Sequence, residues 1–160
     1  MEIILAENHG FCYGVKRAVE MANEAANGAG KSYTLGPIIH NPQVVGRLES
    51  KGVKPIDEVS DIDSGTMIIR SHGVGPAIYE EAENKGLNIV DATCPHVKKA
   101  QQDAKSVIED GMTLVILGEK NHPEVKSINL WANNEGIIIE DEESAQKLQV
   151  VEKMGVVVQT

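Results

Sequence analysis

The stretch TMIIRSHGVGPAIYEEAENKGLNIVDATC, residues 66–94, decides the fold. Its two ends, residues 66–70 and 87–92, are short apolar runs typical of buried strands. The segment between them has Pro76 near its start and Gly86 at its end, which are the residues favoured at those two places in a helix. Because a helix separates the two strands, the stretch predicts a parallel strand pair.

The same alternation extends along the chain in both directions. We expect strands at 1–7, 32–37, 66–70, 87–92, 112–118, 136–140 and 155–160, and helices at 14–28, 41–52, 75–86, 95–111, 122–134 and 141–149. This order predicts an α/β fold in which mostly parallel sheets are wrapped by helices. The long helix expected at 95–111 can begin a second α/β unit. We therefore expect a first domain at residues 1–94 and a second at 95–160.

Composition narrows the class of protein. The 160 residues are 41% hydrophobic but only 3% aromatic, so the core has to be aliphatic. No apolar run approaches the roughly 20 residues of a membrane span, and the N-terminus lacks the basic start of a signal peptide. We therefore expect a cytoplasmic protein with no membrane partner. The net charge of −9 argues against nucleic acid as a partner, but a small phosphorylated ligand needs only a local positive site.

Histidines and cysteines are placed non-randomly. All of them lie where an expected strand is followed by the start of an expected helix, namely His9, Cys12, His40, His72, Cys94, His96 and His122. Loops at the carboxyl ends of parallel strands meet at one edge of a sheet, so this pattern predicts a shared crevice. His40, His72 and His122 are each followed by Pro or Gly at a helix start, where free N–H groups attract anions. We expect these three to bind a diphosphate, and we assign no role to the other two histidines.

The two cysteines leave several interpretations open. Cys12 and Cys94 are inert thiols, one of them is a nucleophile paired with a histidine, or both are metal ligands. Two cysteines do not complete a zinc or iron–sulfur site, which usually has three or four ligands. Under the metal interpretation, the missing ligands come from a segment outside this chain.

Two further residues are candidates for the same crevice. Glu124 either complements the dipole of the helix that follows His122 or delivers a proton to a bound ligand. Thr160 can hydrogen-bond a ligand hydroxyl from the end of the last expected strand. The chain stops there, directly after a β-branched run. From this ending we expect a protein cut at a domain edge.

Five blocks of sequence carry a resemblance to a known family. They are GFCYGVKRAVEMA (10–22), IIHNPQVVGRLESKGV (38–53), SHGVGPAIYEEAENKGLNIVDATCPHVKKAQ (71–101), NHPEV (121–125) and VVVQT (156–160). In this order they resemble the 4-hydroxy-3-methylbut-2-enyl diphosphate reductases, which perform the last step of the non-mevalonate isoprenoid pathway. The resemblance covers residues 1–160.

The resemblance implies an architecture and a set of roles. The family has three α/β domains in a pseudo-threefold arrangement around a 4Fe-4S cluster held by three cysteines. Cys12 and Cys94 match the first two cysteines, and the third lies beyond this chain, as does the third domain. The implied diphosphate ligands are His40, His72 and His122, the implied proton donor is Glu124, and the implied substrate contact is Thr160.

The implied reaction is the reductive dehydroxylation of (E)-4-hydroxy-3-methylbut-2-enyl diphosphate to isopentenyl and dimethylallyl diphosphate. Its electrons come from a carrier such as ferredoxin or flavodoxin. Two alternatives remain open for this chain. One is a two-domain anion-binding scaffold without redox activity. The other is a Cys-dependent α/β hydrolase that uses Cys12 at a helix start.

Overall fold

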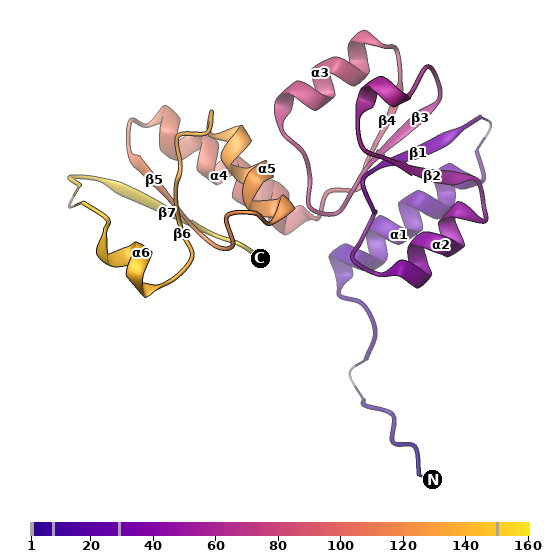
Figure 1. The fold of residues 1–160 in the computed structure, drawn as a ribbon, viewed down its shortest axis with the longest axis horizontal. Helices are drawn as coiled ribbons and strands as arrows, with labels where there is room; N and C mark the ends of the chain where they lie inside the picture. Colours follow the sequence, from indigo (N-terminus) through magenta and orange to yellow (C-terminus); the bar gives the residue numbers. More distant parts are fainter. Residues whose placement is uncertain (1, 8, 29, 150) are drawn as a thin grey trace.

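In a computed structural model of the protein, two parallel sheets with their own helices lie one beside the other (Figure 1). The structure describes residues 2–7, 9–28, 30–149 and 151–160. The strands are β1 Ser32–Leu35, β2 Val53–Ile56, β3 Thr66–Ile69, β4 Asn88–Asp91, β5 Thr113–Leu117, β6 Ile137–Ile139 and β7 Met154–Val158. The helices are α1 Tyr13–Ala26, α2 Pro42–Glu49, α3 Pro76–Asn84, α4 Pro95–Glu109, α5 Pro123–Trp131 and α6 Glu142–Gln146, with a short 3-10 helix, η1, at Val59–Asp61.

Both sheets have the topology expected from alternating strands and helices. The first sheet has the strand order β2-β1-β3-β4 and the second the order β6-β5-β7. Every strand pair is parallel. The predicted α/β class with parallel sheets is therefore confirmed. Among the described residues, none of the helices has both the length and the hydrophobicity that a bilayer span requires.

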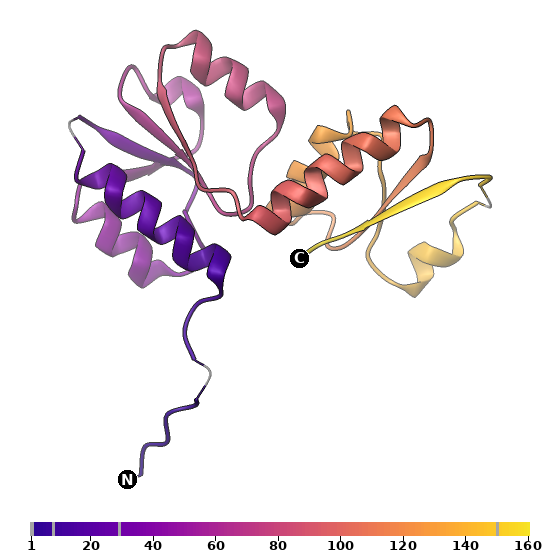
Figure 2. The ribbon, with the colours of Figure 1, turned by 180° about the vertical axis from the view of Figure 1, so that it is seen from behind.

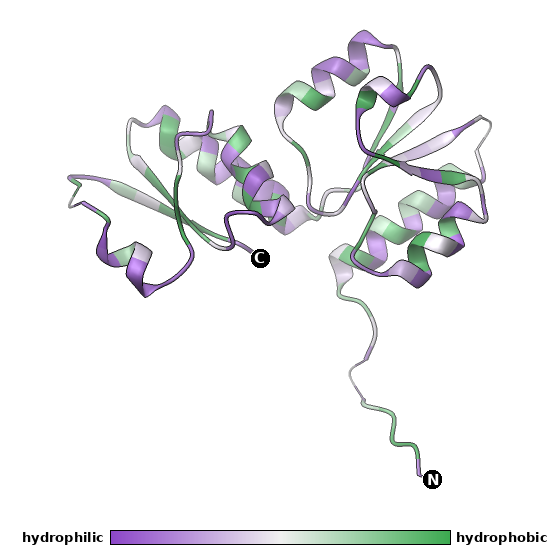
Figure 3. Ribbon diagram, in the orientation of Figure 1, coloured by the Kyte–Doolittle hydropathy of each residue, from purple (hydrophilic) through white to green (hydrophobic). Residues whose placement is uncertain are grey.

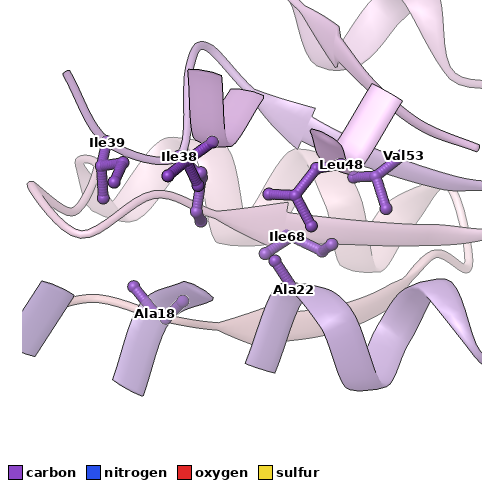
Figure 4. Packing of buried hydrophobic residues seen from close by; sticks show 9 residues of the cluster. Ala18, Ala22, Ile38, Ile39, Leu48, Val53 and Ile68 are labelled. Carbon is purple, nitrogen blue, oxygen red and sulfur yellow. The ribbon is translucent and has the colours of Figure 1, made fainter. Parts of the chain in front are cut away.

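The central strand β3 shows how the first sheet is covered. Successive side chains of a strand point to opposite faces, and those of β3 enter two different cores. Ile68 packs with Ala18 and Ala22 of α1, whose small side chains let the helix lie close to the sheet (Figure 4). Met67 and Ile69 pack on the other face, in the cluster that α3 covers. The second sheet has one core, formed by β5, β7, α4 and α5.

The strand expected at 1–7 is wrong for residues 2–7, and Met1 lies outside the described residues. Residues 2–7 form neither helix nor strand. Ile3, Ile4 and Leu5 are 80%, 84% and 73% exposed, and both ribbon views show this apolar segment extending away from the two sheets (Figures 2 and 3). Its composition suits a strand, but a strand needs a neighbour, and no described strand pairs with it.

The sequence also failed to indicate strand β2. Lys54 and Pro55 interrupt its apolar pattern, so the segment resembled a loop. Proline has no N–H to donate and is tolerated mainly in edge strands. β2 is an edge strand of the first sheet and pairs with β1 alone among the described strands. This position explains why the strand forms despite its proline.

Candidate functional site

Three histidines from three separate loops lie against one another. His40 follows β1, His72 follows β3 and His122 follows β5, so the cluster draws on both sheets. The ring centroids are 4.6 Å apart for His40 and His72, 5.3 Å for His72 and His122, and 6.0 Å for His40 and His122. One nitrogen from each ring lies within 4.8 Å of the other two. We call these three residues the histidine cluster.

Helix starts position two of the rings. His122 is the N-cap of α5, and its Nδ1 accepts a hydrogen bond from the Glu124 N–H at 3.2 Å. The neutral ring therefore carries its proton on Nε2, which is a donor. His40 directly precedes Asn41, whose Oδ1 accepts the Val44 N–H at 3.1 Å and begins α2. Both histidines thus lie beside the N-terminus of a helix, the positive end of its dipole, which favours a nearby anion.

The surroundings of the third ring, His72, disfavour its protonated form. Burial and then the charges of His40, Arg70 and His122 lower the pKa of His72 from 6.5 to about 4. At pH 7 its imidazole is neutral and offers one donor and one acceptor nitrogen. Its Nδ1 is buried and makes no hydrogen bond to any described residue. A bound ligand can therefore use this ring without competing with the protein for that nitrogen.

Helix α5 of the second sheet holds the loop that carries His72. The Oγ of Ser127 lies 2.7 Å from the His72 carbonyl oxygen and 2.8 Å from the Glu124 carbonyl oxygen, so its one proton is shared between these two acceptors. Gln101 of α4 donates to the same Oγ at 3.2 Å, and both side chains are buried. Two residues further along the loop, the Val74 carbonyl oxygen accepts the indole N–H of Trp131 at 2.8 Å. The position of His72 therefore depends on how the two sheets are joined.

The remaining candidates line one cavity of about 340 Å³. Its lining includes Cys12, Cys94, His72, Glu124 and Thr160. These residues come from the starts of three helices, from the loop after β3 and from the end of β7. In both ribbon views, the C-terminus lies between the two halves of the molecule (Figures 1 and 2). The thiols, one imidazole of the histidine cluster and a carboxyl group thus share one hollow.

Both cysteines are N-cap residues, Cys12 of α1 and Cys94 of α4. The N–H of Cys94 donates to the Ser71 carbonyl oxygen at 2.9 Å, which links its loop to that of His72. Gly14 makes room for the thiol, since a Cβ at that position would lie 2.5 Å from the Cys94 Sγ. The expected strand before Cys12 is absent from residues 2–7, so this thiol reaches the cavity from an irregular segment.

Glu124 is tied to the end of the chain. Its carboxylate is buried, and its Oε1 accepts the backbone N–H of Thr160 at 2.6 Å. The neighbouring Gln159 side chain accepts the Glu119 N–H at 2.9 Å, in the loop after β5. These two bonds join the end of β7 to the segment that carries His122. The charged group that the sequence placed in a first helical turn is therefore held in a fixed orientation.

The two histidines without an assigned role lie outside the histidine cluster. His96 was expected in a loop, but it is the second residue of α4 and is exposed, although it borders the cavity. The ring of His9 is also exposed and lies 2.8 Å from the Ala6 carbonyl oxygen.

Arg17, which follows Cys12 in the sequence, donates to the Thr93 carbonyl oxygen at 3.1 Å. This arginine braces the loop before Cys94.

Sequence reasoning missed the residues that position the site. Ser127 and Gln101 lie in helices among apolar neighbours, and nothing in the sequence separates them from other polar residues. Arg70 ends an apolar run, and the sequence led to no expectation about its role. Together, the groups described here can bind an anion through imidazole N–H groups, ligate a soft metal through thiolates, and hold a proton on a carboxyl group.

The chain is similar to known proteins over nearly all of its length. The sequence matches the family described as LytB protein over residues 3–160. It is 52% identical to the 4-hydroxy-3-methylbut-2-enyl diphosphate reductase of Geotalea uraniireducens and 51% identical to that of Geobacter metallireducens. Each match covers 100% of this chain and 57% of the relative, so the chain spans little more than half the length of these relatives.

Solved structures give the same result. A structure described as (E)-4-hydroxy-3-methyl-but-2-enyl diphosphate reductase, the terminal enzyme of the non-mevalonate pathway, superposes with a TM-score of 0.86 at 45% identity. That match covers 99% of this chain and 58% of the other. The corresponding reductase from Plasmodium falciparum gives a TM-score of 0.91 at 32% identity, over 96% of this chain and 50% of the other. From the family match and these relatives, we conclude that the chain belongs to the LytB protein family.

Proposed function

We propose that this chain forms the substrate-binding part of a reductase that converts (E)-4-hydroxy-3-methylbut-2-enyl diphosphate to isopentenyl and dimethylallyl diphosphate. One observation carries the proposal: the histidine cluster adjoins a cavity lined by both cysteines and Glu124. Within the proposal, residues 1–94 and 95–160 are two α/β domains. The boundary falls at Cys94, the residue before α4, so the site forms where the domains meet.

In this proposal the histidine cluster binds the diphosphate. The Nε2–H of His122 is available to donate, because its Nδ1 already accepts the Glu124 N–H. His72 is neutral at pH 7, and an adjacent anion would favour its protonated form. The positive dipole ends of α2 and α5 add positive potential at the same place. An anionic group therefore finds both donors and partial positive charge.

The residues present fit part of a 4Fe-4S site. Cys12 and Cys94 line one cavity, each at a helix N-terminus, and Gly14 leaves space beside the Cys94 sulfur. Thiolates are the usual ligands of such a cluster, and the third would come from outside residues 1–160. When bound, the cluster supplies electrons for the reductive removal of a hydroxyl group. A carrier such as ferredoxin or flavodoxin is the proposed source of those electrons.

Glu124 and Thr160 act on the hydroxyl end of the ligand in this proposal. The Glu124 carboxyl group holds the proton that leaves with the hydroxyl as water. The Thr160 N–H fixes Oε1 of that carboxyl group at 2.6 Å, which limits its freedom to turn away from the cavity. The Thr160 side chain borders the same cavity and can hydrogen-bond the substrate hydroxyl.

Calorimetric titration with inorganic pyrophosphate tests whether the histidine cluster binds the diphosphate. We expect His40→Ala and His122→Ala each to weaken binding by about ten-fold, since each removes one hydrogen bond to a charged ligand. His9→Ala and His96→Ala are matched controls, because both remove exposed histidines outside the cluster. Unchanged affinity in both cluster variants would contradict the proposal.

An anion-binding module without redox activity is the second candidate. The observation in its favour is that the chain has two cysteines rather than three. Anaerobic reconstitution with iron and sulfide separates the two functions, since a cluster gives the protein broad visible absorbance. We expect the chain alone to retain little cluster. A stoichiometric, stable cluster on residues 1–160 would contradict the need for a third ligand from elsewhere.

A further inference from the structure

The histidine cluster has the composition of a transition-metal site as well as that of an anion site. Three imidazole nitrogens, one per ring, lie within 4.8 Å of one another. In a tetrahedral zinc site with Zn–N bonds of about 2.0–2.1 Å, neighbouring ligand nitrogens are roughly 3.4 Å apart. The rings therefore have to approach one another by about 1.4 Å or less to reach that geometry. Since all three histidines lie in loops or at a helix start, side-chain rotation can supply this movement.

We propose that His40, His72 and His122 bind a divalent transition metal, with Zn²⁺ as the ion that best fits three imidazoles. Imidazole is a preferred ligand of zinc, and three histidines with one open position form a known type of zinc site. The exposed side of the cluster at His40 leaves the fourth position to water. This site goes beyond the proposed function, because it requires neither the diphosphate nor the iron–sulfur cluster.

The hydrogen bonds around the rings determine how easily each one can bind a metal. Nδ1 of His72 is buried without a partner among the described residues, so a bond to it displaces no such hydrogen bond. His122 differs, because its Nδ1 accepts the Glu124 N–H at 3.2 Å. If Nε2 of His122 ligates the metal, the ring proton moves to Nδ1 and that long hydrogen bond is lost. The ion thus binds at the expense of one N-cap contact of α5.

Charged residues near the histidine cluster should affect the binding of a cation and the binding of an anion in opposite directions. Arg70 is close enough to contribute to the lowered pKa of His72, so its guanidinium repels a cation at the cluster. The same positive charge attracts a diphosphate. The buried Glu124 carboxylate, two residues from His122, acts in the opposite sense for both ligands. Neutralising Arg70 should therefore change metal and pyrophosphate affinity in opposite directions.

Cobalt titration followed by visible absorbance tests the metal site directly. The titration uses the 160-residue chain with Cys12→Ser and Cys94→Ser, so that thiolates cannot hold the ion. We expect one Co²⁺ per chain, with the absorbance of a four-coordinate imidazole complex, and its displacement by Zn²⁺. His40→Ala, His72→Ala and His122→Ala should each weaken binding by about ten-fold or more. His9→Ala and His96→Ala in the same background serve as matched controls.

Arg70→Gln provides a second measurement. We expect it to tighten Co²⁺ binding and weaken pyrophosphate binding, whereas Arg70→Lys should leave both close to the values of the parent chain. Equal Co²⁺ affinity in the parent chain and all three cluster variants would overturn the metal site, and so would equal losses in the two controls. Because metal and pyrophosphate are titrated separately, a failure to bind one of them leaves the test of the other unaffected.

Discussion

The histidine cluster reaches, through His72, the cavity that the cysteine pair lines, but the two groups differ in completeness. The cluster has three rings within contact distance, all from described residues, and hydrogen bonds fix its loops from both sheets. The cysteine pair offers two thiols, and iron–sulfur sites usually have three or four ligands. Under the proposed function, residues 1–160 thus supply three imidazoles for the diphosphate and two thiolates for the iron–sulfur cluster. Diphosphate binding should therefore survive in this chain under conditions in which the chain does not retain an iron–sulfur cluster.

Cys94→Ser gives the largest expected effect and tests the cysteine pair, the less complete of the two groups. It should abolish the iron and sulfide that remain on the chain after anaerobic reconstitution, because only one thiolate is left. Pyrophosphate binding should be unchanged within about two-fold, since no imidazole is altered. Iron analysis and calorimetry on the same sample measure both. Equal iron content in the variant and the parent chain would mean that Cys94 is an inert thiol.

Glu124→Gln separates proton delivery from binding. Glutamine keeps an oxygen that can accept the Thr160 N–H, so the join between α5 and the end of β7 should persist. We expect pyrophosphate affinity within about three-fold of the parent value, and turnover lower by about 100-fold in a protein that carries the cluster, because an amide cannot deliver the proton. Lost binding together with unimpaired turnover would refute this role. Titration and steady-state turnover make the two measurements.

Gly14→Ala tests whether the space beside the Cys94 sulfur is required. The added Cβ would lie 2.5 Å from Sγ, so the thiol or α1 has to move, and we expect a loss of about 1–3 kcal/mol in the free energy of unfolding. Urea denaturation measures it. Gly46→Ala in α2 is the matched control, because no atom lies within 4 Å of its added Cβ. That control should be neutral or slightly stabilising. Equal effects of the two substitutions would show that the contact with Cys94 is not limiting.

Much of the fold could be predicted because its signals are local. Apolar runs indicated six of the strands, and proline or glycine at helix ends, such as Pro76 and Gly86, indicated where the intervening helices begin and end. The failures have a non-local cause. Residues 2–7 have the composition of a strand but no partner among the described strands, and β2 forms around Pro55 because β1 provides one. A strand depends on its neighbour, which composition does not reveal.

The site was predictable to a similar extent and for a related reason. Loops that follow parallel strands meet at one edge, so the common placement of His40, His72 and His122 followed from topology. Contact distances, burial and the lowered pKa of His72 depend on how the two sheets join. That join involves Ser127, whose buried position in α5 no local pattern distinguishes. The residues proposed to contact the ligand were therefore easier to find than Ser127, which is proposed to position one of them.

Ser127→Ala gives the smallest expected effect and tests that positioning role. The substitution leaves the His72 carbonyl oxygen without its Oγ donor, and the loss of one such bond costs about 1 kcal/mol, so we expect pyrophosphate affinity to fall by about five-fold. Trp131→Phe is the informative control, since it removes the bond to Val74 and leaves that of His72 intact. If Ser127 merely stabilises the fold, the two variants should lower the melting temperature and the affinity in parallel. A fall in affinity for Ser127→Ala that exceeds its effect on melting, with a shifted His72 ring signal in NMR spectra, would show that α5 positions the histidine cluster.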